Sequence, residues 1–128
     1  MTLEQALLQT NRNMVVFDLA LGSGALLAPR PTLRFVFGHE DPSPDAESWV
    51  RRCGPIWLTF AAAHLVAARR GRSEDWWALA WLRGTEIATD AVLAESPSVT
   101  RRGARVGLWL AGAANLAMAL GFARLARR

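Results

Sequence analysis

Apolar residues concentrate in four segments of the chain, over residues 14–28, 54–68, 76–95 and 106–123. The last segment, VGLWLAGAANLAMALGFA, carries no charge and would be apolar on every face of a helix. A soluble amphipathic helix would show a polar stripe, so this pattern is typical of a transmembrane helix. The segment 76–95 also begins like a membrane helix, but three ionisable residues follow its apolar start.

Helix-start signals extend these segments into longer helices. Ser43-Pro44-Asp45-Ala46-Glu47 combines an N-cap serine, a proline at the first position and acids in the first turn, and Ser73-Glu74-Asp75 is a similar start. Gly54-Pro55 is expected to kink or divide the second helix. We predict helices over about 3–28, 44–70, 74–95 and 100–126, within a single domain that spans 1–128.

The connection between the first two predicted helices has a different character. Its sequence, PRPTLRFVFGHEDPSP, holds an apolar and aromatic patch that is followed by glycine and acids. We interpret it as a re-entrant or interfacial segment that lies back against the bundle.

Composition and charge support this fold class. Hydrophobic residues make up 52% of the chain, Ala, Leu and Gly are abundant and Tyr is absent, which favours an all-helical chain. All 15 basic residues are arginines, and their clusters flank the apolar runs, where arginine anchors membrane helices. The two sides of a four-span bundle would carry seven arginines each, so the count does not choose an orientation. We predict an all-α integral membrane four-helix bundle with an interfacial segment between helices 1 and 2.

Several function classes are excluded by what the sequence lacks. The arginines are spread among helix ends, without interleaved aromatic residues to stack on bases, so we predict no nucleic-acid partner. Cys53 is the only cysteine, which rules out an internal disulfide framework. There is no Glu-x-x-His pair, His-x-x-x-His pair, phosphate loop or nucleophile elbow, and we predict no metal site.

Six polar side chains inside the predicted membrane helices are the candidate site residues. An ionisable group near the centre of a membrane helix costs roughly 2.5–3.5 kcal/mol on insertion scales, so it needs a partner or water. Arg83, Glu86 and Asp90 are spaced i, i+3, i+7 and share one helical face, which must point into the bundle. The six residues are Asp18, His64, Arg83, Glu86, Asp90 and Asn115.

Structural and functional interpretations of these residues both remain open. In the structural one, Arg83 and Glu86 form an internal ion pair, Asp90 lies in the headgroup layer, and His64 is a satisfied buried histidine. Asp18 then pairs with Arg12, Arg83 or a backbone group purely for packing. In the functional one, the six side chains converge on a polar pocket that binds the head of a lipophilic molecule or relays protons.

Small residues indicate where the helices approach each other closely. Gly22 lies one turn beyond Asp18 and would allow a close helix contact there. Gly107-x-x-x-Ala111 lies on the same face as Asn115 and favours close packing of the last helix.

The first half of the chain has a recognisable set of small residues and helix ends. They are Gly22, Gly24, the Ala28-Pro29 stop, the Phe37-Gly38 end and the Arg52-x-Gly54 opening of the second helix. In these features it resembles the DoxX-like group of small bacterial membrane proteins, which the rest of the chain matches only in helix count. The resemblance implies a multi-pass protein of the bacterial cytoplasmic (inner) membrane, and some members of the group are linked to quinone-coupled oxidoreduction.

We therefore expect a small integral membrane protein that acts as an accessory subunit or binds a lipophilic, quinone-like ligand. Its expected partners are the lipid bilayer and a larger membrane complex or further copies of itself. The alternative is a membrane enzyme or proton-coupled transporter that uses Glu86 and Asp90 as acid/base groups. No catalytic residue set is predicted.

Overall fold

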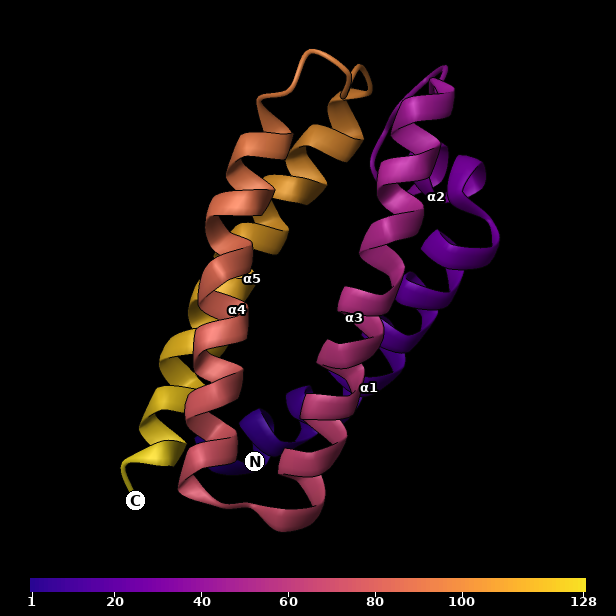
Figure 1. Ribbon diagram of the computed structural model, residues 1–128. Helices are drawn as coiled ribbons and strands as arrows, with labels where there is room; N and C mark the ends of the chain where they lie inside the picture. The colour runs from indigo at the N-terminus through magenta and orange to yellow at the C-terminus, as the bar shows by residue number, and fades with distance from the viewer.

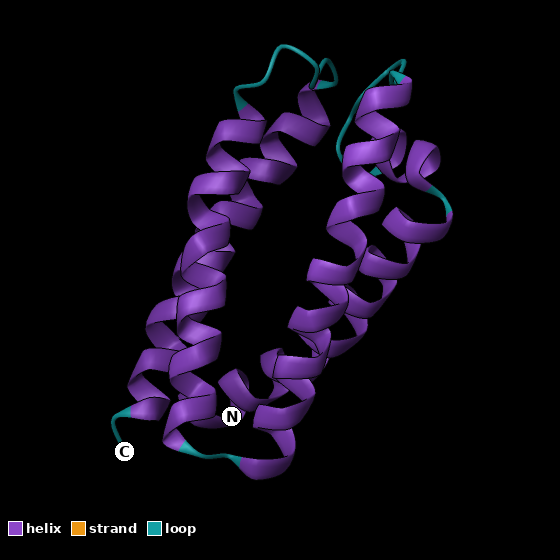
Figure 2. Ribbon diagram, in the orientation of Figure 1, coloured by secondary structure: helices purple, strands orange, loops and turns teal.

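The computed structural model describes residues 1–128, and the chain folds into five α-helices without β-strands (Figure 2). The all-helical prediction is confirmed, and the four predicted long helices agree with the observed ones to within two residues. One of them, α5, is long and apolar enough to cross a membrane, whereas the others do not pass the same test. The helices are α1 (Leu3–Leu27), α2 (Pro29–Phe35), α3 (Pro44–Arg70), α4 (Ser73–Ala94) and α5 (Arg102–Ala126).

The long helices form two pairs. Helix α1 packs along α3, and α4 packs along α5, while the contacts between the two pairs are sparse (Figure 1). The pairs come together at both ends of the molecule, where α1 contacts α5 near the chain termini and the α2–α3 connection meets the α4–α5 connection at the opposite end. Both termini and the α3–α4 turn lie at the same end of the molecule, and we call this the terminal end. The opposite end, with the α2–α3 and α4–α5 connections, is the loop end.

Local sequence signals account for the ends of α3. The Ser43 side chain accepts a hydrogen bond from the Ala46 amide at 3.2 Å, with Pro44 at the first helical position, so the predicted cap is confirmed. Gly71 ends the helix with a φ of +61°, in the left-handed region that glycine adopts without strain. Pro55 does not divide α3, which runs without interruption. Packing along α1 holds the helix together although the proline removes one backbone donor.

The segment after α1 packs against the bundle, as predicted, but begins as a helix. Helix α2 starts directly after the Ala28 cap, and the buried side chains of Leu33 and Phe37 pack with Val50 and Val99. The following loop meets the α4–α5 connection in an isolated antiparallel bridge between His39 and Val99. This bridge joins the two helical pairs at the loop end.

Two separate apolar clusters stabilise the ends of the bundle. The loop-end cluster comprises Ala25, Leu33, Phe37, Val50, Ala94, Val99 and Leu108. The terminal-end cluster comprises Ala67, Trp76, Leu79, Ala80, Met118, Phe122 and Ala126. The candidate polar residues lie between these clusters along the helices, so the middle of the bundle is not a continuous apolar core.

Glycines set the closest helix contacts. A Cβ on Gly22 would lie 2.8 Å from the Gly54 carbonyl oxygen, and a Cβ on Gly54 would lie 2.8 Å from the Gly22 oxygen. The predicted close approach at Gly22 is therefore confirmed, between α1 and α3. The predicted packing at Gly107 is wrong, because nothing lies within 4 Å of a Cβ there. On α5, Gly112 lies against α4 instead.

Candidate functional site

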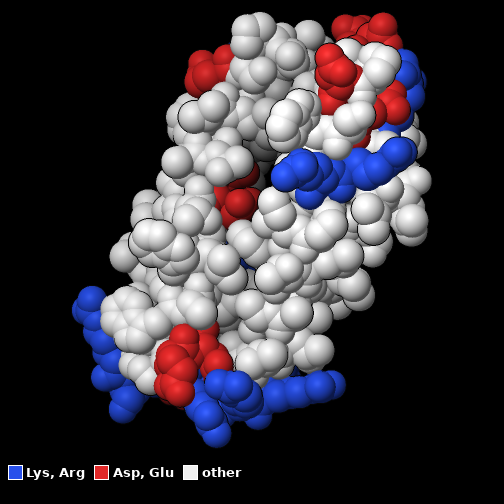
Figure 3. Space-filling model, viewed as in Figure 1, with Lys and Arg blue, Asp and Glu red and all other residues white.

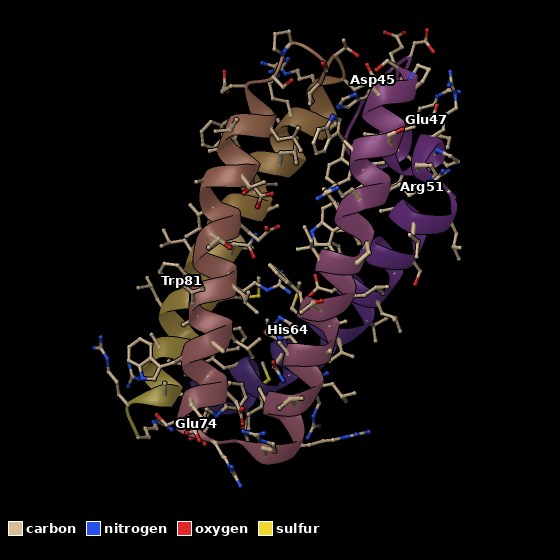
Figure 4. The ribbon with its side chains drawn as sticks, viewed as in Figure 1. Asp45, Glu47, Arg51, His64, Glu74 and Trp81 are labelled. Atoms are coloured by element: carbon tan, nitrogen blue, oxygen red, sulfur yellow. The ribbon has the colours of Figure 1, made fainter.

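Four polar side chains from three helices form one buried network in the middle of the bundle. Asn11 and Asp18 come from α1, His64 from α3 and Arg83 from α4, and none is more than 2% exposed. Arg83 forms an ion pair with Asp18 through Nη2, and its Nε donates to His64 Nε2 at 3.0 Å. The network joins the two helical pairs where direct helix contacts are sparse, and Figure 4 shows His64 between them.

The neighbours of His64 define its tautomer. Since Arg83 has only donors, Nε2 of His64 must accept, and the ring hydrogen is assigned to Nδ1. Nδ1 then donates to Asn11 Oδ1 at 2.6 Å, while Asn11 Nδ2 donates to the backbone carbonyl of His64 at 3.0 Å. The imidazole is thus neutral, and both of its nitrogens are satisfied. His64 is therefore a buried histidine whose two ring nitrogens both have hydrogen-bond partners, as the structural interpretation of the sequence expected.

The predicted ion pair between Arg83 and Glu86 is not formed. Arg83 reaches across to Asp18 on α1, because that carboxylate is fully buried and has no other cation within reach. The guanidinium also lies over the Phe60 ring, with Cζ 5.4 Å from the ring centroid. A single arginine therefore holds α1, α3 and α4 together.

Asp90 and Asn115 form a second polar contact, between α4 and α5. Asn115 Nδ2 donates to Asp90 Oδ2 at 2.8 Å, and the two residues are 9% and 7% exposed. The expectation that Asp90 lies in an exposed headgroup layer is therefore wrong. Two buried oxygen atoms in these networks have no hydrogen-bond partner, Oδ1 of Asp18 and Oδ1 of Asn115.

A cavity of about 1490 Å³ separates the two helical pairs. Of its 32 lining residues, 21 are hydrophobic, so most of the wall is apolar. Figure 3 shows a hollow between the pairs, with acidic groups inside it. Five of the six predicted site residues line the cavity, and His64 lies behind Arg83 rather than on the wall. The five are Asp18, Arg83, Glu86, Asp90 and Asn115.

Aromatic residues line the loop-end side of the cavity. The rings of Phe37 and Trp57 are stacked with their centroids 5.7 Å apart, and both residues contribute to the wall. His39 lies nearby in the α2–α3 connection and also faces the cavity. Partial burial lowers the pKa of His39, so this imidazole is neutral at neutral pH.

Sequence reasoning missed Asn11. This asparagine lies in the first predicted helix but is absent from the six candidate site residues, and it is fully buried against His64. The available signal was its spacing, because Asn11 lies seven residues before Asp18 and therefore on the same helical face.

Asn11→Ala is expected to lower the free energy of unfolding by about 1–3 kcal/mol, because His64 loses a buried hydrogen-bond partner. The matched control is Asn13→Ala, which removes an exposed asparagine two positions away, bonded only to the Gln9 side chain. Its effect is expected to stay within about 0.5 kcal/mol. Unfolding curves of the purified variants measure both, and equal losses would contradict the role assigned to Asn11.

No group of three or more His, Cys, Asp or Glu side chains is placed so that it could hold a metal ion. No protein-family model matches the chain, and it matches neither a curated protein in sequence nor a solved structure in fold.

Proposed function

We propose that this is a small integral membrane protein that binds a lipophilic molecule between its two helical pairs. The observation that carries the proposal is the cavity, a large and mostly apolar space with a few polar groups on its wall. At about 1490 Å³ it exceeds the roughly 300–1,000 Å³ of ordinary ligand pockets. It has room for a ring system and part of an alkyl chain.

The apolar residues on the outside support a position in the membrane. Only 28% of the most apolar window of α5 is buried, whereas a core helix of a soluble protein would be mostly buried. At 1.5 Å per residue, the 25 residues of α5 extend about 37 Å, enough to cross a hydrocarbon core of about 30 Å. Each long helix exposes large apolar side chains, such as Val16, Leu19, Ile56, Leu65, Trp81, Val92, Leu116 and Leu120.

Charged residues are arranged as a bilayer requires. Helix α3 has no Asp, Glu, Lys or Arg between Arg52 and Arg69, and α5 has none between Arg105 and Arg124. Figure 4 places Asp45 and Glu47 at the loop end and Glu74 at the terminal end. On the face seen in Figure 3, most of the surface between the two ends is uncharged. The charges of α4 are turned inward, where Arg83 and Asp90 are buried.

Binding of a lipophilic molecule is testable with a neutral quinone, the ligand class that the DoxX-like resemblance implies. Protein purified in a mild neutral detergent is expected to bind decylubiquinone at about one molecule per chain. The quinone ring is expected to lie against the indole ring of Trp57. Native mass spectrometry and quenching of tryptophan fluorescence measure the complex. Trp57→Leu should weaken binding, whereas Trp81→Leu, at an outward-facing tryptophan, should not. Absence of binding by any lipophilic probe would contradict the proposal.

One observation also favours the alternative, a proton-coupled transporter or membrane enzyme. Glu86 faces the cavity without an ion pair, and Asp90 lies one turn along the same helix. Both carboxyl groups are thus placed to exchange protons with a bound molecule. Docking to a larger membrane complex, or self-association, remains a prediction from the sequence.

A further inference from the structure

Acidic side chains are prominent among the polar groups on the cavity wall. Asp18, Glu86 and Asp90 line the space, together with Asn115. Asp18 is fully buried and pairs with Arg83, and the free Oδ1 atoms of Asp18 and Asn115 are covered by protein. The carboxyl groups that a ligand in the cavity can reach are therefore those of Glu86 and Asp90. The amide orientation of Asn115 is defined because its Nδ2 donates to Asp90.

The arginines on the cavity wall already have hydrogen-bond partners within the protein. Arg83 is bonded to Asp18 and His64. Arg101, at the loop end, donates to the backbone carbonyl oxygens of Arg34 and Phe35. His39 carries no charge at neutral pH.

Glu86 and Asp90 are carboxyl groups without a cationic partner in an ion pair. Asp90 accepts the amide of Asn115, and both residues line the cavity. They are spaced i, i+4 on α4 and therefore lie on the same helical face. The other walls of the cavity are mostly apolar, so a cation placed beside an ionised carboxylate there is attracted more strongly than in water.

We propose that the ligand of this cavity is a lipophilic organic cation, an amine or onium ion. Its charged head lies beside Glu86 and Asp90, and its apolar part packs against Phe37 and Trp57. The stacked rings of Phe37 and Trp57 offer the apolar part of such a ligand an aromatic contact surface. A neutral quinone fits the apolar part of the cavity but lacks the positive charge, so it is expected to bind more weakly than the cation. The inference rests on the proposed function and narrows its ligand class.

Tetraphenylphosphonium and tetraphenylborate test this inference, since they have nearly the same shape and opposite charge. Isothermal titration of the purified protein in dodecyl maltoside is expected to show the cation binding at least tenfold more tightly than the anion. Glu86→Gln should weaken binding of the cation at least tenfold, and Asp90→Asn should also weaken it while keeping its contact with Asn115. The matched control is Glu95→Gln, at the end of the same helix and bonded to Trp109, which should leave the affinity unchanged.

Equal binding of the two ions would overturn the inference, as would unchanged affinity of both the Glu86→Gln and Asp90→Asn variants. If decylubiquinone binds and tetraphenylphosphonium does not, the cation proposal fails while the proposed function stands. If neither the cation nor the neutral quinone binds, both proposals fail.

Discussion

Arg83→Met is expected to lower the free energy of unfolding by about 3–5 kcal/mol, among the largest effects of any single substitution in this chain. The change leaves the Asp18 carboxylate buried without a cation, and it removes the donor to His64 Nε2. Methionine is an unbranched side chain that fills much of the same space. The loss of unfolding free energy therefore comes mainly from the missing charge and hydrogen bonds rather than from a cavity. Denaturant or thermal unfolding of the purified protein measures the loss.

Two further variants show whether the loss comes from the buried ion pair. Arg70→Met removes an exposed arginine that pairs with Asp75 at 3.0 Å, and it is expected to cost less than about 1 kcal/mol. The double variant Asp18→Leu/Arg83→Met removes both buried charges and should recover more than half of the loss. Equal losses at Arg70 and Arg83, or no recovery in the double variant, would contradict the central role of this pair.

Leu116→Arg is expected to reduce accumulation in the membrane severely. Leu116 lies near the middle of α5, is 48% exposed and lies outside the large cavity. If this face contacts lipid, a central arginine costs roughly 2.5–3.5 kcal/mol on insertion scales. If the face contacts water, the same substitution is expected to change stability by no more than about 0.5 kcal/mol. The two environments therefore predict clearly different outcomes.

Leu3→Arg is the matched control, because Leu3 is 58% exposed and lies at the terminal end of α1. An arginine there would reach water, so membrane accumulation should stay near that of the parent protein. Quantitative blotting of membrane and soluble fractions compares the two variants. Normal accumulation and stability of Leu116→Arg would argue against lipid contact on this face of α5.

Much of the fold was predictable because its signals are local. The cap at Ser43 and the apolar runs placed the long helices, and Gly22 indicated a close helix contact. The short helix α2 was missed because its proline-containing sequence is typical of a chain break as well as of a helix start.

The residues that line the site could be predicted from the sequence, but which of them pair with each other could not. Arg83 and Glu86 are neighbours on one helix, which made them the expected ion pair. Which partner an arginine takes depends on how the helices are rotated about their axes, and a hydrogen-bond partner such as Asn11 is fixed by the same rotation. The spacing along one helix does not contain that information. The likeness to DoxX-like proteins and the nature of the ligand likewise remain predictions.

The most direct test of the account asks whether the protein is integral to the membrane. Membranes from cells that express the chain are washed with alkaline carbonate, which releases peripheral and soluble proteins, and the pellet and supernatant are compared. The account predicts that the protein stays in the pellet and is released only by detergent. Recovery of folded protein in the carbonate supernatant would contradict it.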